Sequence, residues 1–169
     1  AGIDGTMTAP LMRGKASIAQ SSSKSLYDFI RGNPDGFTVA VDGKTSPASG
    51  FAVAPIKAAE IRVAPDKLNL AVVDELIDNI TWITDLTDAD VYAGGWLNSE
   101  DGLYYLDASQ VVDTLEQSVY IADAAKQEAV FDLGEFNEHR TTETLDLLKD
   151  TGRYEANAHN VARRNAFEL

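Results

Sequence analysis

Few residues in this chain could support nucleophilic catalysis. It has no cysteine, and its only histidines are His139 and His159. A nucleophilic serine needs a base and a group that orients the base, and the chain lacks the Gly-x-Ser-x-Gly turn that would present one. The serine run 21–23 lies in a segment without hydrophobic periodicity. We therefore predict no catalytic residue and a protein that is not an enzyme.

Two short segments combine side chains of metal-ligand type. Glu135-x-x-Glu138-His139 lacks the second histidine of a zinc-binding helix. Asp85-x-x-Asp88-x-Asp90 lacks the ligand spacing and the distal glutamate of a calcium-binding EF-hand. Both are predicted to be exposed, solvated segments, and we expect neither a metal nor a cofactor. Acids are so abundant that any carboxylate pair is uninformative, which leaves an enzyme with an unrecognised carboxylate site as a third hypothesis.

The distribution of charge is the most unusual property of the sequence. The formal net charge is −13, and no Lys or Arg occurs from Leu68 to Ala125. That stretch holds twelve acids, namely Asp74, Glu75, Asp78, Asp85, Asp88, Asp90, Glu100, Asp101, Asp107, Asp113, Glu116 and Asp123. A field of one sign steers partners of the opposite sign, and phosphate contacts need Lys and Arg. We expect a basic protein partner and no direct nucleic-acid binding; the alternative is an acidic surface that only confers solubility.

Aromatic residues cluster in the same acidic stretch, and some of them could anchor an interface. Tyr104 and Tyr105 must point to opposite faces of a strand, so that one belongs to the core and the other is exposed. We predict Tyr104 or Trp96 as the anchor. The predicted partner-binding residues are Asp74, Asp78, Asp85, Asp88, Asp90, Trp96, Glu100, Asp101 and Tyr104.

Periodicity predicts the elements that would position these residues. A helix begins near Ser23 or Ser25 and ends at Gly32-Asn33-Pro34. Strands at 37–41 and 51–54 are predicted to pair as a hairpin. The strongest helix covers 70–84, with Asn69 as its N-cap and an apolar stripe opposite its acids.

A second hairpin is predicted from strands at 91–97 and 103–106, because Asp101-Gly102 favours the tight turn between them. Asp107 or Ser109 would then cap a helix that ends at Lys126-Gln127. A strand at 129–133 follows. The rest, where Gly152 interrupts the pattern, is predicted to be helical.

Hairpins that alternate with helices predict an α+β fold. The sheet would be mostly antiparallel, built from two hairpins plus a further strand, and packed against helices on one face. We predict a flexible arm at 1–23, a core domain at 24–138 and a helical tail at 139–169. Residues 1–6 precede Met7 and read as a cloning remnant, with processing of a longer N-terminus as the alternative. The lack of cysteine and of a membrane-spanning run favours a cytoplasmic protein with no membrane partner.

Five short motifs between residues 35 and 136 carry a resemblance to a known group. They are Asp35-Gly36-Phe37-Thr38, Ser49-Gly50-Phe51-Ala52-Val53-Ala54-Pro55, Gly94-Gly95-Trp96-Leu97, Tyr105-Leu106-Asp107-Ala108-Ser109 and Ala129-Val130-Phe131-Asp132-Leu133. With them the segment resembles uncharacterised small accessory proteins of actinobacterial phages, plasmids and integrated elements. The motifs are turns, strand cores and a helix cap, so the resemblance implies no chemistry.

These observations favour a binding role. The leading hypothesis is an acidic, protein-binding module of a mobile element. Its partner would be a basic protein, for example a host protein that binds nucleic acid. By analogy of size and charge alone, it would act as DNA-mimicking anti-CRISPR or antirestriction inhibitors do. The alternative is a phage structural or self-assembling component, in which the helical tail mediates homo-oligomer formation.

Overall fold

The computed structural model describes residues 23–168, so the predictions for residues 1–22 lie outside the described part of the chain. Within residues 23–168 there are five α-helices and a seven-stranded sheet in which every strand pair is antiparallel, and the predicted α+β fold is confirmed. The strands are β1 (Phe37–Val39), β2 (Phe51–Val53), β3 (Ile61–Val63), β4 (Val91–Leu97), β5 (Tyr104–Val112), β6 (Ala129–Asp132) and β7 (Asn137–Arg140).

The sheet is organised around the long hairpin of β4 and β5. Its strand order is β1-β4-β5-β2-β6-β7, and β3 pairs with the first part of β5, beside the stretch that β2 occupies farther along. The predicted β4–β5 hairpin is confirmed, and Gly102 takes the positive φ of 74° that its turn requires. Each of the three-residue strands β1, β2 and β3 thus pairs with a strand of this hairpin.

The predicted hairpin of 37–41 with 51–54 is wrong. Phe37 pairs with Gly95 of β4, whereas Phe51 pairs with Val112 of β5. Between β1 and β2 the chain makes a separate turn, in which the amide of Ala40 donates to the carbonyl of Thr45 over 2.8 Å. Two short strands satisfy more backbone groups on two long neighbours than on each other.

Two further predictions after Leu106 are corrected. Asp107 and Ser109 do not cap a helix, because β5 continues to Val112 and Thr114 caps α3 (Leu115–Ala124) instead. The polar residues Asp107 and Ser109 alternate with Leu106 and Ala108, which is the pattern of a strand with one apolar face. Residues 137–140, which lack an apolar pattern, form β7 against β6 rather than an unpaired turn and the start of a helical tail.

The helices begin and end where local signals place them. The first described helix covers 23–32. The next helix, α2 (Leu70–Thr87), is capped by Asn69, whose side chain accepts a hydrogen bond from the amide of Val72 over 3.0 Å. α2 extends past the predicted end to a left-handed C-cap at Asp88. The last two helices are α4 (Thr141–Asp150) and α5 (Ala156–Glu168). The positive-φ Gly152 lies between them, where the helical pattern of the tail was predicted to be interrupted.

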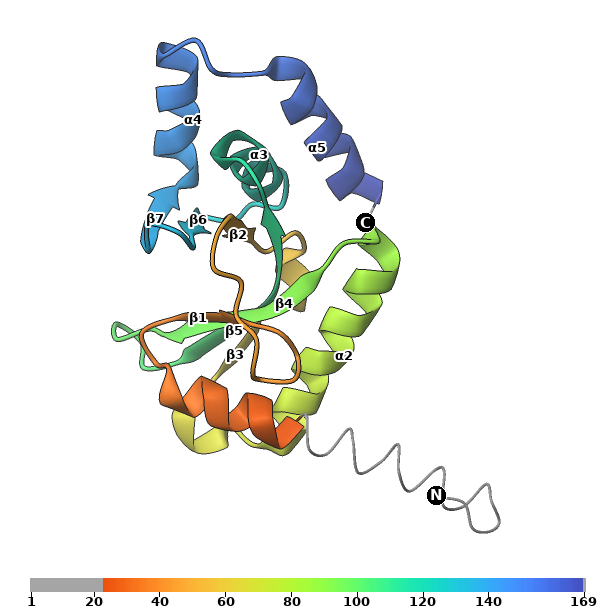
Figure 1. The fold of residues 1–169 in the computed structure, drawn as a ribbon, viewed down its shortest axis with the longest axis vertical. Coiled ribbons are helices and arrows are strands. Elements are labelled where there is room, and N and C mark those ends of the chain that lie inside the picture. The colour runs from red at the N-terminus through yellow and green to blue at the C-terminus, as the bar shows by residue number, and fades with distance from the viewer. Residues whose placement is uncertain (1–22, 169) are drawn as a thin grey trace.

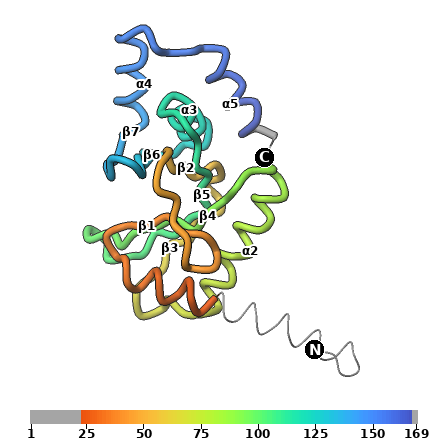
Figure 2. The backbone as a smooth tube through the Cα atoms, in the orientation of Figure 1, coloured from red at the N-terminus to blue at the C-terminus, as the bar shows by residue number. Residues whose placement is uncertain are grey.

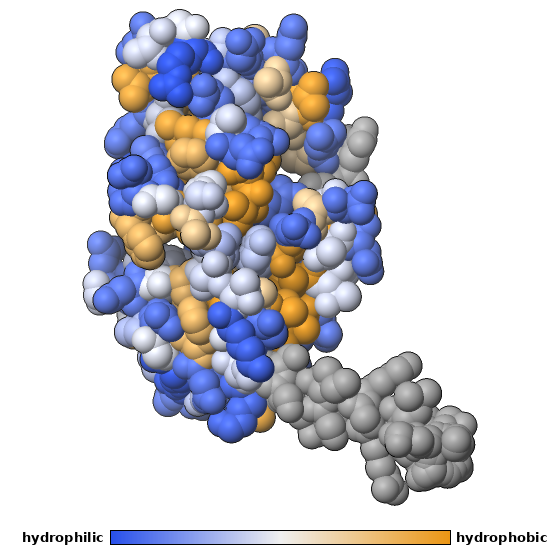
Figure 3. Space-filling model, in the orientation of Figure 1, coloured by the Kyte–Doolittle hydropathy of each residue, from blue (hydrophilic) through white to orange (hydrophobic). Residues whose placement is uncertain are grey.

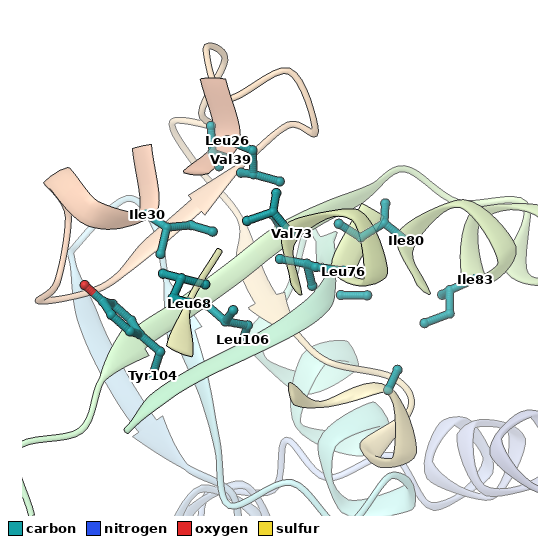
Figure 4. Packing of buried hydrophobic residues seen from close by; sticks show 13 residues of the cluster. Leu26, Ile30, Val39, Leu68, Val73, Leu76, Ile80, Ile83, Tyr104 and Leu106 are labelled. Atoms are coloured by element: carbon teal, nitrogen blue, oxygen red, sulfur yellow. The ribbon is translucent and has the colours of Figure 1, made fainter. Parts of the chain in front are cut away.

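The main core lies between the sheet and the first two described helices (Figures 1 and 2). The buried stripe of α2 consists of Val73, Leu76, Ile80 and Ile83, as its periodicity predicts, and it packs against Leu106 of β5 (Figure 4). Burying one such side chain contributes about 1.5–3 kcal/mol. This core fixes the orientation of α2, because its apolar stripe has to face the sheet.

A second core joins the C-terminal helices to the rest. α3 covers β2 and β6 through Ala122, which packs with Val53 and Val130. On its other side, Val119 and Tyr120 pack with Leu145 and Leu148 of α4. The upper part of the molecule in Figure 1 is thus a layer of α4 and α5 on α3, which itself lies on the sheet.

All of these helices pack on the same side of the sheet. Residues directly opposite each other in an antiparallel pair share a face. Val53 of β2 is opposite Gln110 of β5, which shares its face with Leu106 and Ala108 in the α2 core. The hydrophobic clusters within residues 23–168 contain no residue of the other face of the sheet. Arg62, Trp96, Tyr105 and Asp107 lie on that other face.

Candidate functional site

The nine predicted binding residues do not form a single surface. Asp74, Asp78 and Asp85 lie on the exposed side of α2. Asp88 and Asp90 follow in the connection from α2 to β4. Glu100 and Asp101 lie in the turn at the opposite end of β4, on the far side of the molecule from α2 in Figure 1. The acidic stretch is therefore divided between two ends of the β4–β5 hairpin.

One coherent acidic surface remains along α2. Helical spacing places two neighbouring rows of residues side by side on its solvent face. We define the α2 acidic face by the residues of these rows, Asp74, Glu75, Asp78, Trp82, Asp85 and Leu86. Trp82 and Leu86 are 43% and 50% exposed, so the carboxylates surround accessible apolar surface. Acids beside an exposed tryptophan are the combination that a basic interface would fit.

The carboxylates of the α2 acidic face form no salt bridge with another residue of the range 23–168. Asp74 accepts a hydrogen bond from the hydroxyl of Ser23, which is a neutral donor. The acids of α3 differ, because Glu116 lies 3.1 Å from Arg153 and Asp123 lies 3.5 Å from Arg163. Arg153, which lies between α4 and α5, and Arg163 of α5 thus neutralise acids of α3 rather than acids of α2.

Tyr104 was predicted as a possible exposed anchor, and the structure shows that it is not one. It is only 3% exposed and belongs to the main core, on the same face of the sheet as Leu106 (Figure 4). The alternation of the strand therefore places Tyr105 on the other face, next to Trp96, which is 44% exposed. Sequence alone could show that these tyrosines differ, but not which one faces the helices.

Trp96 and Tyr105 are the centre of a second exposed surface, on the face of the sheet away from the helices. Their ring centroids are 5.4 Å apart. The guanidinium of Arg62 lies 4.3 Å from the centroid of the Tyr105 ring, and its Nε donates to Glu60 over 2.6 Å. We call Glu60, Arg62, Trp96, Asp101, Tyr105 and Asp107 the Trp96 patch.

Hydrogen bonding at the edge of this patch fixes the charge of two groups. The hydroxyl of Tyr105 donates to the carboxylate of Asp101. This bond, with a second from the amide of Leu103, lowers the pKa of Asp101 below its ordinary value. The same bond to Asp101 raises the pKa of Tyr105. At neutral pH the pair is therefore a neutral phenol that donates to a charged carboxylate.

Asp107 is the one acid of the patch that lies toward the interior of the sheet. Burial raises its pKa to about 6, the hydrogen bond that Ser109 donates over 2.6 Å opposes that shift, and the nearby charge of Glu60 adds to it. Its carboxyl leans over Gly94, where a Cβ atom would lie 2.7 Å from Oδ1. A glycine in the middle of β4 thus makes room for a partly desolvated carboxyl group.

The two segments with side chains of metal-ligand type do not form a metal-binding geometry. The described part of the chain contains no group of three or more His, Asp or Glu placed to hold a metal ion. His139 of the Glu135-x-x-Glu138-His139 segment lies 3.9 Å from Asp132 and packs near Phe51. A shallow hollow of about 390 Å³ lies beside the start of α4, and it is lined by side chains of both charges, including Lys126, Glu128 and Arg140.

Sequence analysis missed the role of His159, which is 1% exposed. Its Nε2 lies 2.7 Å from Asp123, its Nδ1 lies 2.6 Å from the Tyr154 hydroxyl, and its ring stacks on Tyr120. Both ring nitrogens are thus bound inside the α3–α5 contact. No local pattern around His159 identifies this position, because its partners lie on other elements.

Comparison with protein-family models, with curated proteins and with solved structures found no match to this chain. The resemblance to accessory proteins of mobile elements therefore stays a prediction. No helix of the described residues is long and apolar enough to span a membrane.

Proposed function

We propose that this protein is a non-enzymatic binding module that docks on a basic surface of a partner protein through the α2 acidic face. The observation that carries the proposal is the row of exposed carboxylates on α2 without salt bridges among the described residues, placed around exposed Trp82 and Leu86. Charge of one sign accelerates encounter with an oppositely charged partner, and a central aromatic residue supplies contact area.

The partner class that we propose is a nucleic-acid-binding protein in the cytoplasm of the host. Surfaces that bind nucleic acid are rich in Lys and Arg, which suit the carboxylates of α2. The resemblance to mobile-element proteins supports the same choice, since such elements gain from blocking host defence. Inhibition of the anti-CRISPR or antirestriction type is the form that this proposal takes.

Because the acids lie at two ends of the β4–β5 hairpin, the proposed docking surface is smaller than the acidic stretch of the sequence. Glu100 and Asp101 lie too far from α2, at the other end of β4, to share one flat contact with it. Trp96 lies on the opposite face of the sheet from α2. The docking surface is therefore one helix face rather than the whole stretch from Leu68 to Ala125.

A matched pair of triple variants tests the proposal. The first, Glu75→Gln with Asp78→Asn and Asp85→Asn, removes charge from the α2 acidic face. The second, Glu135→Gln with Asp146→Asn and Asp150→Asn, removes the same charge from exposed positions elsewhere. A partner is first captured from host lysate at low salt with the wild-type protein and identified. Its association rate is then measured with each variant at low and at physiological salt.

We expect the first triple variant to associate about tenfold more slowly than wild type at low salt, with a smaller difference at higher salt. The second should behave as wild type does. If both variants slowed association equally, the loss of net charge alone would explain the change in rate, and a specific α2 surface would be contradicted. Light scattering at several concentrations adds a check, because a stable homo-oligomer that buries α2 would favour the self-assembly alternative.

A further inference from the structure

The helix-free face of the sheet carries a group of side chains that the proposed function does not use. The Trp96 patch lies there, separated from the α2 acidic face by the full thickness of the sheet and the main core. A partner surface seated on α2 cannot reach it. The patch therefore has to be explained by itself.

One aromatic ring of the patch, that of Tyr105, already binds a cation within the chain. The guanidinium of Arg62 stacks on Tyr105 while Glu60 accepts from its Nε. Arg62 is thus held by one ring and one carboxylate, the arrangement that makes cation–π contacts favourable. Trp96 is next to Tyr105, and tryptophan binds cations better than tyrosine does. Within residues 23–168, no cation is recorded over the Trp96 ring.

The acids of the patch outnumber its cation. Arg62 interacts with the carboxyl groups of Glu60 and Asp101, and Asp107 lies close to Glu60. The patch is therefore negative once all three acids are ionised. Asp107 is a diagonal neighbour of Trp96 across the β4–β5 pair, since Trp96 is opposite Tyr105 and Gly94 is opposite Asp107. Diagonal cross-strand neighbours are within reach of long side chains. A second cation on Trp96 would therefore approach Asp107.

Asp107 forms no salt bridge with another residue of the range 23–168, although it is partly removed from water. An ionised carboxyl that is partly removed from water costs free energy unless a partner compensates it. Ser109 supplies one hydrogen bond, and glycine at position 94 leaves room for the carboxyl. A cation bound next to Asp107 would supply the missing compensation.

We propose that the Trp96 patch binds a guanidinium or ammonium side chain of a partner polypeptide, stacked on the exposed Trp96 ring with its charge toward Asp107. Tyr105 and Arg62 form the wall on one side of this contact, and Asp107 with Ser109 lies at its inner end. The patch is a second recognition site, independent of the α2 acidic face, and it selects a single basic residue rather than a basic surface.

The test uses the full chain and two short peptides. One is the pentapeptide Gly-Gly-Arg-Gly-Gly with blocked ends, and the other replaces arginine by citrulline, which has the same shape without the charge. The indole N–H signals of Trp82 and Trp96 are followed by NMR and assigned with Trp82→Phe and Trp96→Phe. We expect the arginine peptide to shift the Trp96 signal and the citrulline peptide to leave it in place.

Variants then identify the carboxyl group responsible. Asp107→Asn keeps the shape of the side chain and should weaken binding at Trp96 about tenfold. Glu138→Gln removes an acid from β7 on the same face of the sheet and should leave binding unchanged. Spectra of each variant without peptide show whether it is folded, and the first α2 triple variant should bind at Trp96 as wild type does.

The pH dependence supplies a second readout. Protonation of Asp107 below pH 6 should weaken the arginine contact in the wild-type protein. The same titration of Asp107→Asn isolates this effect from Glu60 and Asp101, the other acids around Arg62 and Tyr105. Equal shifts with both peptides, unchanged binding in Asp107→Asn, or a Trp96 shift with a neutral oligosaccharide such as cellotriose but not with arginine would each overturn the proposal.

Discussion

The imidazole Nε2 of His159 lies 2.7 Å from the Oδ2 atom of Asp123 and thereby joins α5 to α3. The second nitrogen meets the hydroxyl of Tyr154 over 2.6 Å, so the ring is bound at both ends inside the contact. A polar group that is buried with both partners present stabilises a unique packing. Loss of the imidazole would leave the Tyr154 hydroxyl without this partner and Asp123 with Arg163 alone.

His159→Ala should therefore lower the free energy of unfolding by about 2–4 kcal/mol. The measurement is urea denaturation followed by circular dichroism. The matched control is Asn160→Ala, which changes an exposed residue of the same helix and should stay within about 0.5 kcal/mol of wild type. Equal effects of the two substitutions would show that the His159 contacts contribute nothing to stability.

Asp107 should make the folded state less stable as pH rises. Its pKa is raised to about 6 in the folded protein, so the folded state holds this proton more tightly than the unfolded chain, whose aspartates titrate near pH 4. The contribution is fully present below about pH 4 and is lost as pH rises through 6, with a total of up to about 3 kcal/mol.

The comparison that isolates Asp107 is between wild type and Asp107→Asn. The difference in their unfolding free energies at pH 4.5 and pH 7.5 cancels the contributions of the remaining carboxyl groups. We expect Asp107→Asn to be the more stable of the two at pH 7.5, and to lose most of that advantage at pH 4.5. A difference that does not change with pH would contradict a raised pKa.

The adjacent glycines of β4 should respond differently to substitution by alanine. A Cβ at Gly95 would lie 2.4 Å from the backbone oxygen of Tyr105, which cannot move without breaking the sheet. A Cβ at Gly94 would meet the ends of the Asp107 and Ser109 side chains, which can rotate away. Gly95→Ala should therefore cost about 2 kcal/mol or more, and Gly94→Ala clearly less.

The two glycine variants also report on the Trp96 patch. Gly94→Ala should move the Asp107 carboxyl toward water and lower its pKa, which carbon-detected NMR of the carboxyl group can follow. If instead Gly94→Ala were the more destabilising change, the carboxyl of Asp107 would be held more rigidly than its contacts indicate.

Lys126 ends α3 with a positive φ of 59°, a conformation that favours glycine. The amide of Gln127 donates to the carbonyl of Ala122 over 2.8 Å across this turn, so the conformation is needed to end the helix. Lys126→Gly should raise the midpoint of urea denaturation and stabilise the fold by about 0.5–1 kcal/mol. Lys149→Gly, within α4 where φ is helical, should destabilise by a similar amount, and a gain there would refute the explanation.

Patterns local in sequence were sufficient for much of this fold. The periodicity of α2, its cap at Asn69 and the Asp101-Gly102 turn each depend on contacts within a few residues, and all were predicted correctly. The α+β class follows from the same patterns. By contrast, the pairing of β1 and β2 depends on what β4 and β5 offer as neighbours, which their own three residues cannot encode.

The candidate sites divide in the same way. The sequence by itself determined that the stretch from Leu68 to Ala125 holds acids and no Lys or Arg, and that α2 turns its acids to solvent, because composition and helical period are properties of the chain. Only the tertiary structure decided that Tyr104 faces the core and that Arg62 stacks on Tyr105. It also decided that His159 meets Asp123. The physical reason is that strand register and helix packing bring together residues far apart in sequence. A one-residue change in the register of β5 would exchange the faces of Tyr104 and Tyr105.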